Sequence, residues 1–78
     1  MKEQKIKQDE IFIGKNIRRI RIEKGFGQTE LVRRLQLEGV GMTRETLVKI
    51  ERGIQHIQAS QLRAFRDVLQ TSYDELLK

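Results

Sequence analysis

The apolar residues of this chain recur at intervals of three and four, which is the spacing of an α-helix with one side against a core. Ile13, Ile17 and Ile20 form such a stripe, and the β-branched residues follow helical rather than alternating spacing. The pattern therefore predicts an all-α fold. Five short helices are expected, over about residues 11–24, 28–37, 43–52, 59–70 and 72–78.

Residues suited to helix ends stand at several of these boundaries. Thr43 can cap the third helix, and Ser72 with Glu75 has the spacing of a capping box that opens the fifth. Gly25 can supply the left-handed residue that ends the first helix, and Gly53 ends the third. The second and third helices are joined by a glycine-bearing segment. This order matches a helix-turn-helix, in which the second helix enters the major groove of DNA.

The length of 78 residues suits one domain with one modest core, which we expect over residues 11–78. Residues 1–10 are rich in charge and are expected to form a flexible tail; the alternative is a basic arm that touches the phosphate backbone or an adjoining groove. No apolar run approaches the roughly 18 residues of a membrane span, and no secretory signal is present. A cytoplasmic protein is expected.

The net charge of +5 and the pI near 10 favour an anionic partner such as nucleic acid. There is no cysteine, the carboxylates are dispersed, and His56 is the only histidine, so neither a metal site nor a nucleophilic dyad can be assembled around it. We expect no enzymatic activity, no cofactor and no metal. For His56 this leaves phosphate contact or plain exposure to solvent.

The third predicted helix carries side chains suited to the edges of base pairs. With Leu47 and Ile50 towards the core, the opposite side presents Glu45, Val48, Lys49 and Arg52, and Arg44 lies on its flank. Long donors, an acceptor and a small apolar group are the side chains that distinguish bases in a major groove, although an ordinary solvated helix face has a similar composition. At the start of the second helix, the Gln28 amide can donate to a phosphate.

Four segments of the chain resemble the Cro/C1-type (XRE-like) helix-turn-helix domains. They are IGKNIRRIRIEKG at 13–25, GQTELVRRL at 27–35, TRETLVKIERG at 43–53 and TSYDELL at 71–77, so the resemblance covers residues 13–77. It implies a lambda-repressor-like compact five-helix bundle that binds double-stranded DNA as a homodimer. A transcriptional regulator, and more specifically a repressor, is the function that follows.

The resemblance also implies roles for individual residues. Arg44, Glu45 and Lys49 are expected to meet base edges, with Val48 against a thymine methyl group. Arg21 and Glu51 are expected to form an internal ion pair between the first helix and the recognition helix. Contacts with the DNA backbone are expected from Lys15, Arg18, Gln28, Thr43, Thr46, Arg52, Gln55 and His56.

Three features depart from the family pattern. The turn between the second and third helices is enlarged, Val32 replaces a small residue, and Gln70 stands where glycine is usual at the end of the fourth helix. An alternative function is an antitoxin or accessory module whose main partner is another protein. That hypothesis relies on apolar residues expected at the surface, namely Ile11, Phe12, Ile22 and Ile54.

Overall fold

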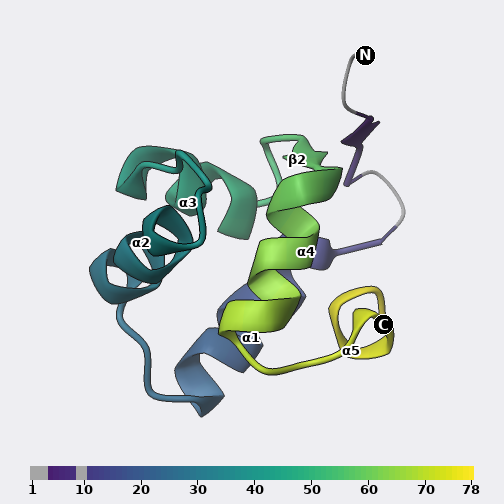
Figure 1. Cartoon of the computed structure of the whole chain (residues 1–78). Coiled ribbons are helices and arrows are strands. Elements are labelled where there is room, and N and C mark those ends of the chain that lie inside the picture. The colour runs from purple at the N-terminus through teal and green to yellow at the C-terminus, as the bar shows by residue number, and fades with distance from the viewer. Residues whose placement is uncertain (1–3, 9–10) are drawn as a thin grey trace.

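The computed structural model describes residues 4–8 and 11–78, and in these residues it contains the five predicted helices (Figure 1). Each helix lies within its expected range, which confirms the helical bundle. The helices are α1 (Ile13–Glu23), α2 (Gln28–Leu37), α3 (Arg44–Glu51), α4 (Ala59–Val68) and α5 (Tyr73–Leu76). Two short strands, β1 (Lys5–Ile6) and β2 (Ile57–Gln58), were not predicted.

Helix α4 runs across the middle of the bundle, with α1 behind it and α2 and α3 to one side (Figure 1). Helix α1 contacts α3 and α5, while α2 contacts α3 and α4. Every helix contributes to one core, and the predicted apolar stripes are buried: Ile13, Ile17, Ile20, Leu31, Leu35, Leu47, Ile50, Leu62, Phe65 and Leu69. Each large side chain removed from water in this way contributes about 1.5–3 kcal/mol.

Helices α1 to α4 all end in the same arrangement, the Schellman motif. At the end of α3, the Gly53 N–H donates to the Ile50 carbonyl over 2.9 Å, and the Ile54 N–H donates to the Lys49 carbonyl over 3.1 Å. The motif needs a left-handed residue after the C-cap, and three of the helices use glycine there. Helix α4 instead uses Gln70, with φ at 52°.

Replacing Gln70 with glycine is expected to raise the free energy of unfolding by about 0.5–1 kcal/mol. A left-handed L-residue costs about 1–2 kcal/mol, and the larger conformational entropy of glycine in the unfolded chain offsets about 0.4–1 kcal/mol of the gain. Urea denaturation measures the difference. Gln70→Ala is the matched control, because it keeps the Cβ atom and should give no stabilisation; a glycine variant no more stable than the alanine variant would contradict the argument.

The N-terminal segment contains a strand that was not predicted. Of the tail expected over residues 1–10, residues 1–3 and 9–10 lie outside the described residues. Lys5 and Ile6 pair antiparallel with Gln58 and Ile57, and the Ala59 N–H donates to the Gln4 carbonyl over 3.2 Å. Ile57 is fully buried, so the connection before α4, which looked polar, contributes to the core. Two-residue strands are too short for any periodicity to be recognised in the sequence.

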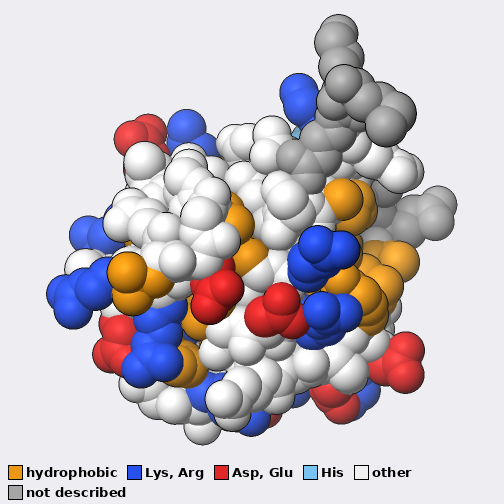
Figure 2. Space-filling model, in the orientation of Figure 1, with side chains coloured by type: hydrophobic (Ala, Val, Ile, Leu, Met, Phe, Trp, Pro, Cys, Tyr) orange, Lys and Arg blue, Asp and Glu red, His pale blue; other side chains and the backbone are white. Residues whose placement is uncertain are grey.

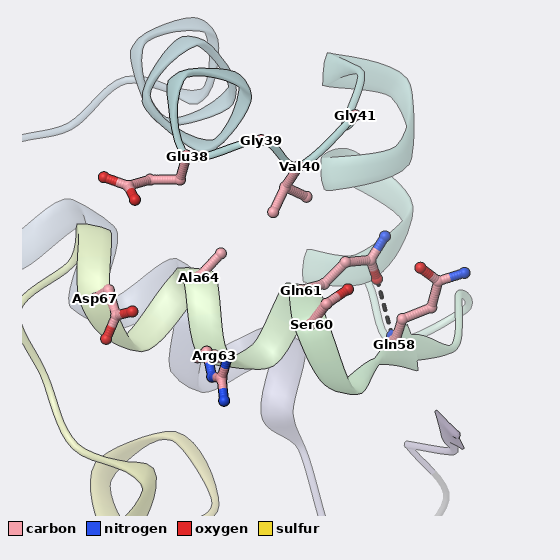
Figure 3. Close-up of a pocket in the computed structure, with 10 residues that line it drawn as sticks. All are labelled: Glu38, Gly39, Val40, Gly41, Gln58, Ser60, Gln61, Arg63, Ala64 and Asp67. Carbon is pink, nitrogen blue, oxygen red and sulfur yellow. Dashed lines mark hydrogen bonds between the residues drawn. The ribbon is translucent and has the colours of Figure 1, made fainter. Parts of the chain in front are cut away.

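The enlarged turn between α2 and α3 occupies residues 38–43 and is ordered by its own contacts. Gln36 donates its amide to the Met42 carbonyl over 2.9 Å, and Met42 is buried. A hollow separates the turn from α4, with Val40 pointing from the turn towards Ala64 on that helix (Figure 3). No residue of α3 lines this hollow, so it lies apart from the outward face of α3.

Candidate nucleic-acid interface

The rotation of α3 about its axis is fixed by its cap and by its buried residues. The Thr43 hydroxyl accepts the Thr46 N–H over 3.1 Å and donates to the Thr46 hydroxyl over 3.0 Å. Leu47 and Ile50 are fully buried, so the opposite side of the helix faces outward.

The outward side of α3 brings the four predicted base-contacting residues together. Arg44, Glu45, Val48 and Lys49 line one hollow with Arg52. The Lys49 ammonium lies 3.5 Å from a Glu45 carboxylate oxygen, and both side chains are well exposed. Such an exposed pair contributes only about 0–1 kcal/mol of stability. Either side chain can therefore leave the pair and contact a base edge with little loss of stability.

A buried ion pair holds α3 against α1. Arg21 and Glu51, the pair implied by the resemblance, meet through two hydrogen bonds, Nε to Oε2 at 2.7 Å and Nη2 to Oε1 at 3.0 Å. Only 9% and 3% of their side-chain surfaces are exposed. Arg21 also donates to the Phe26 carbonyl over 2.9 Å, which fixes the chain between α1 and α2.

Gln28, predicted to bind a phosphate, is engaged with this ion pair. Its amide donates to Glu51 Oε1 over 3.2 Å, which links the start of α2 to the end of α3. A primary amide carries two N–H donors, so a second remains for a phosphate. The residue before Gln28 is Gly27, which has no side chain to cap the first N–H groups of α2.

Two residues that hold the end of α3 were not recognised in the sequence. Gly14 allows α1 to approach so closely that a Cβ atom on it would lie 1.8 Å from the Ile50 carbonyl oxygen. A glycine within a helical pattern is a signal of such close packing. Gln8 donates to the carbonyls of Ile50, over 3.1 Å, and Gln55, over 2.9 Å. Nothing in a segment expected to be flexible pointed to Gln8.

The remaining predicted backbone contacts are distributed over two neighbouring hollows. One is lined by Lys15 and Arg52 together with Gln8, Phe12, Glu51 and Gly53. The other lies against the loop after α3 and is lined by Gln55 and His56 together with Lys7, Gln8, Gly53 and Ile54. Arg18 is exposed on α1 and lines neither hollow, nor the one on α3.

The three hollows form one continuous surface because they share residues. Arg52 links the α3 hollow to the Lys15 hollow, and Gln8 and Gly53 link that one to the loop hollow. Five lysines and arginines line this surface: Lys7, Lys15, Arg44, Lys49 and Arg52. Of the described residues, two acidic ones line it, Glu45 and Glu51, and both are paired with cations. The surface is therefore positive.

The face of the molecule around α4 does not carry charges of one sign. Positive and negative side chains are interspersed there (Figure 2). Arg66 and Asp67 form an exposed pair at 2.8 Å, and the hydrogen bond to Asp67 raises the pKa of Arg66. A face of mixed sign gives little attraction to a polyanion.

Some apolar side chains lie at the surface, as the protein-partner hypothesis requires. Ile11, Phe12, Ile22 and Ile54 are exposed, and the Lys15 ammonium lies 5.1 Å from the centre of the Phe12 ring. In residues 4–8 and 11–78 there is no group of three or more His, Cys, Asp or Glu side chains that could hold a metal. No helix in these residues has the length and apolar character needed to cross a membrane.

A family model described as helix-turn-helix matches residues 17–76. No match is found among curated proteins or among solved structures. The matched range includes α2 to α5 and most of α1. It does not include Gly14, nor Lys7, Gln8 and Lys15, which line the N-terminal side of the positive surface.

Proposed function

Because the chain belongs to the Cro/C1-type (XRE-like) helix-turn-helix family of DNA-binding, non-enzymatic domains, we propose that it is a sequence-specific regulator of transcription. In this proposal α3 lies in the major groove of double-stranded DNA as the recognition helix. The observation that carries it is the hollow on the outward side of α3, where Arg44, Glu45, Val48 and Lys49 lie together.

Each of these side chains matches a feature of a base pair. Arg44 and Lys49 can donate to guanine O6 and N7, Glu45 can accept from cytosine N4, and Val48 can contact a thymine methyl group. Because Lys49 and Glu45 already lie 3.5 Å apart, one guanine–cytosine pair can engage both at once.

Contacts with phosphates would fix the orientation of α3 without selecting sequence. Arg52, Lys15, Gln55 and His56 lie on the positive surface around the end of α3, and Gln28 stands at the start of α2. Thr43 and Thr46 at the start of α3, and Arg18 on α1, complete the proposed set. Counterion release by the cations supplies affinity that falls with salt.

We further propose that the protein acts as a repressor and binds as a homodimer to a palindromic operator. Two copies would place their recognition helices in successive major grooves, about 34 Å apart along one face of the duplex. Three exposed residues are candidates for the contact between copies: Tyr73 in α5, Leu77 directly after it and Phe12 directly before α1.

Two variants, Lys49→Ala and Gln28→Ala, distinguish contact with bases from contact with the DNA backbone. A selection from genome fragments first identifies the preferred duplex. Lys49→Ala is then expected to lower the discrimination at one base pair by about 1–3 kcal/mol, or roughly 5- to 150-fold. Gln28→Ala is expected to weaken the preferred and a scrambled duplex by the same factor. Titrations of both duplexes with the wild type and both variants give the six values needed; a uniform loss for Lys49→Ala would contradict its assignment to base contact.

The alternative function, an antitoxin or accessory module, is favoured by the exposed Ile11, Phe12, Ile22 and Ile54. It predicts a protein complex that survives Lys49→Glu and little preference among duplexes. A preference of about a thousandfold or more for the selected duplex, decreasing steeply with salt, supports the DNA-binding regulator instead.

A further inference from the structure

We infer that residues 4–8 are part of the DNA interface, in which Gln8 positions the loop after α3 and Lys7 contacts a phosphate beside that loop. This inference rests on the proposed DNA binding. It adds to that function a segment outside the residues matched by the family model.

The Gln8 side chain joins the backbones of three separate segments. Its carbonyl oxygen accepts the Gly14 N–H at the start of α1 over 2.6 Å. Its amide donates to the Ile50 carbonyl in α3 and to the Gln55 carbonyl in the following loop, over 3.1 Å and 2.9 Å. Only a primary amide side chain offers one acceptor and two donors on a single planar group. Gln8 therefore sets the distance between the loop and the end of α3.

The pairing of β1 with β2 determines which side chains of the segment face outward. Ile6 is partly buried and packs against the core. Because side chains alternate along an extended chain, Lys5 and Lys7 lie on the side opposite Ile6, and both are exposed. Of the two, Lys7 lines the hollow formed by Gly53, Ile54, Gln55 and His56.

The surroundings of Lys7 favour an anion. Among the described residues that line its hollow none is acidic. The hollow continues into the positive surface through Gln8 and Gly53, so a phosphate backbone that follows Arg52 and Lys15 past the end of α3 reaches Lys7. A lysine at this position adds affinity and carries no information about sequence.

The test of Lys7 is the salt dependence of binding, with Lys24→Gln as the matched control. Lys24 is an exposed lysine at the far end of α1 and lines none of the three hollows. Removal of one phosphate contact makes the slope of log affinity against log salt less steep by about 0.9. The loss of affinity between 50 and 200 mM salt is then about 3.5-fold smaller. We expect this for Lys7→Gln on the preferred and scrambled duplexes, and no change of slope for Lys24→Gln.

The outcomes separate this inference from the proposed function. If wild-type protein prefers the selected duplex and Lys7→Gln has the slope of Lys24→Gln, the Lys7 contact is wrong and the proposed function stands. If wild-type protein shows no preference for any duplex, the proposed function fails and this inference fails with it.

The positioning role of Gln8 is tested by a double-mutant cycle with Lys7. If Gln8 positions the loop and Lys7 for contact with DNA, Lys7→Gln should change the affinity for DNA much less in a Gln8→Ala background than in the wild-type background. Equal changes in both backgrounds would overturn the positioning role. Thermal unfolding checks that each variant is folded. If the Gln8→Ala protein is unfolded, Gln8→Glu replaces it in the cycle, because the glutamate keeps the oxygen that accepts the Gly14 N–H and loses both N–H donors.

Discussion

Replacement of Glu51 with alanine is expected to lower the free energy of unfolding by about 3–5 kcal/mol. The change leaves the Arg21 guanidinium buried without its partner carboxylate, because only 9% of the Arg21 side chain is exposed. The Gln28 amide loses its acceptor at the same time. For a domain whose total stability is about 5–15 kcal/mol, such a loss leaves a large fraction of molecules unfolded on mild heating.

Glu45→Ala is the matched control for this experiment, measured in the same urea series. Glu45 is on the same helix and is also paired with a cation, but 80% of its side chain is exposed, so its removal should change stability by about 0–1 kcal/mol. The double variant Arg21→Met, Glu51→Leu removes both charges and should recover most of the lost stability. Similar losses for Glu51→Ala and Glu45→Ala would show that burial does not govern the Arg21–Glu51 pair.

Gly14→Ala is expected to destabilise the protein by about 1–3 kcal/mol or more, through overpacking. The sign of this effect is informative, since glycine to alanine inside an ordinary helix stabilises by about 0.5–1 kcal/mol. Here the new Cβ atom would lie 1.8 Å from the Ile50 carbonyl oxygen and 2.9 Å from Gln8 Oε1. The Ile50 contact is with backbone, so α1 and α3 must separate to admit the methyl group.

Calorimetry should show the destabilisation by Gly14→Ala as a lower melting temperature, about 4–8 °C for each kcal/mol in a domain of this size. Lys15→Ala is the control, because Lys15 is the next residue of α1 and is exposed. It should change stability by no more than about 0.5 kcal/mol. A Gly14→Ala protein that melts above the wild type would show that the close approach of α1 and α3 is not needed.

The helices could be predicted from the sequence because their determinants are local. The stripe of Ile13, Ile17 and Ile20 and the caps at Thr43 and Ser72 each lie within a few turns of chain, and the structure has them as expected. The β1–β2 pairing was not predictable in this way, since it joins the N-terminal segment to Ile57 and Gln58, far along the chain, and has no periodic pattern.

The parts of the candidate site that could be predicted also depend on local determinants, and the parts that could not depend on contacts between distant residues. The outward set on α3 follows from Leu47 and Ile50, because once these are buried the helix geometry determines what lies opposite. The Arg21–Glu51 pair has a sequence separation of 30, and only the family resemblance suggested it. Gln8 reaches partners 42 and 47 residues away, and no spacing rule connects a side chain in an irregular segment with backbone carbonyls at that distance.

The open turn between α2 and α3 has a practical consequence for spectroscopy. The sequence contains no cysteine, so Gly41→Cys would introduce the single thiol of the chain. A Cβ atom at position 41 meets nothing within 4 Å, and this residue is not among the glycines with positive φ. A spin label or fluorophore attached there would stand two residues before Thr43, the cap of α3. It would report the tilt of that helix while every residue of the proposed DNA interface stays native.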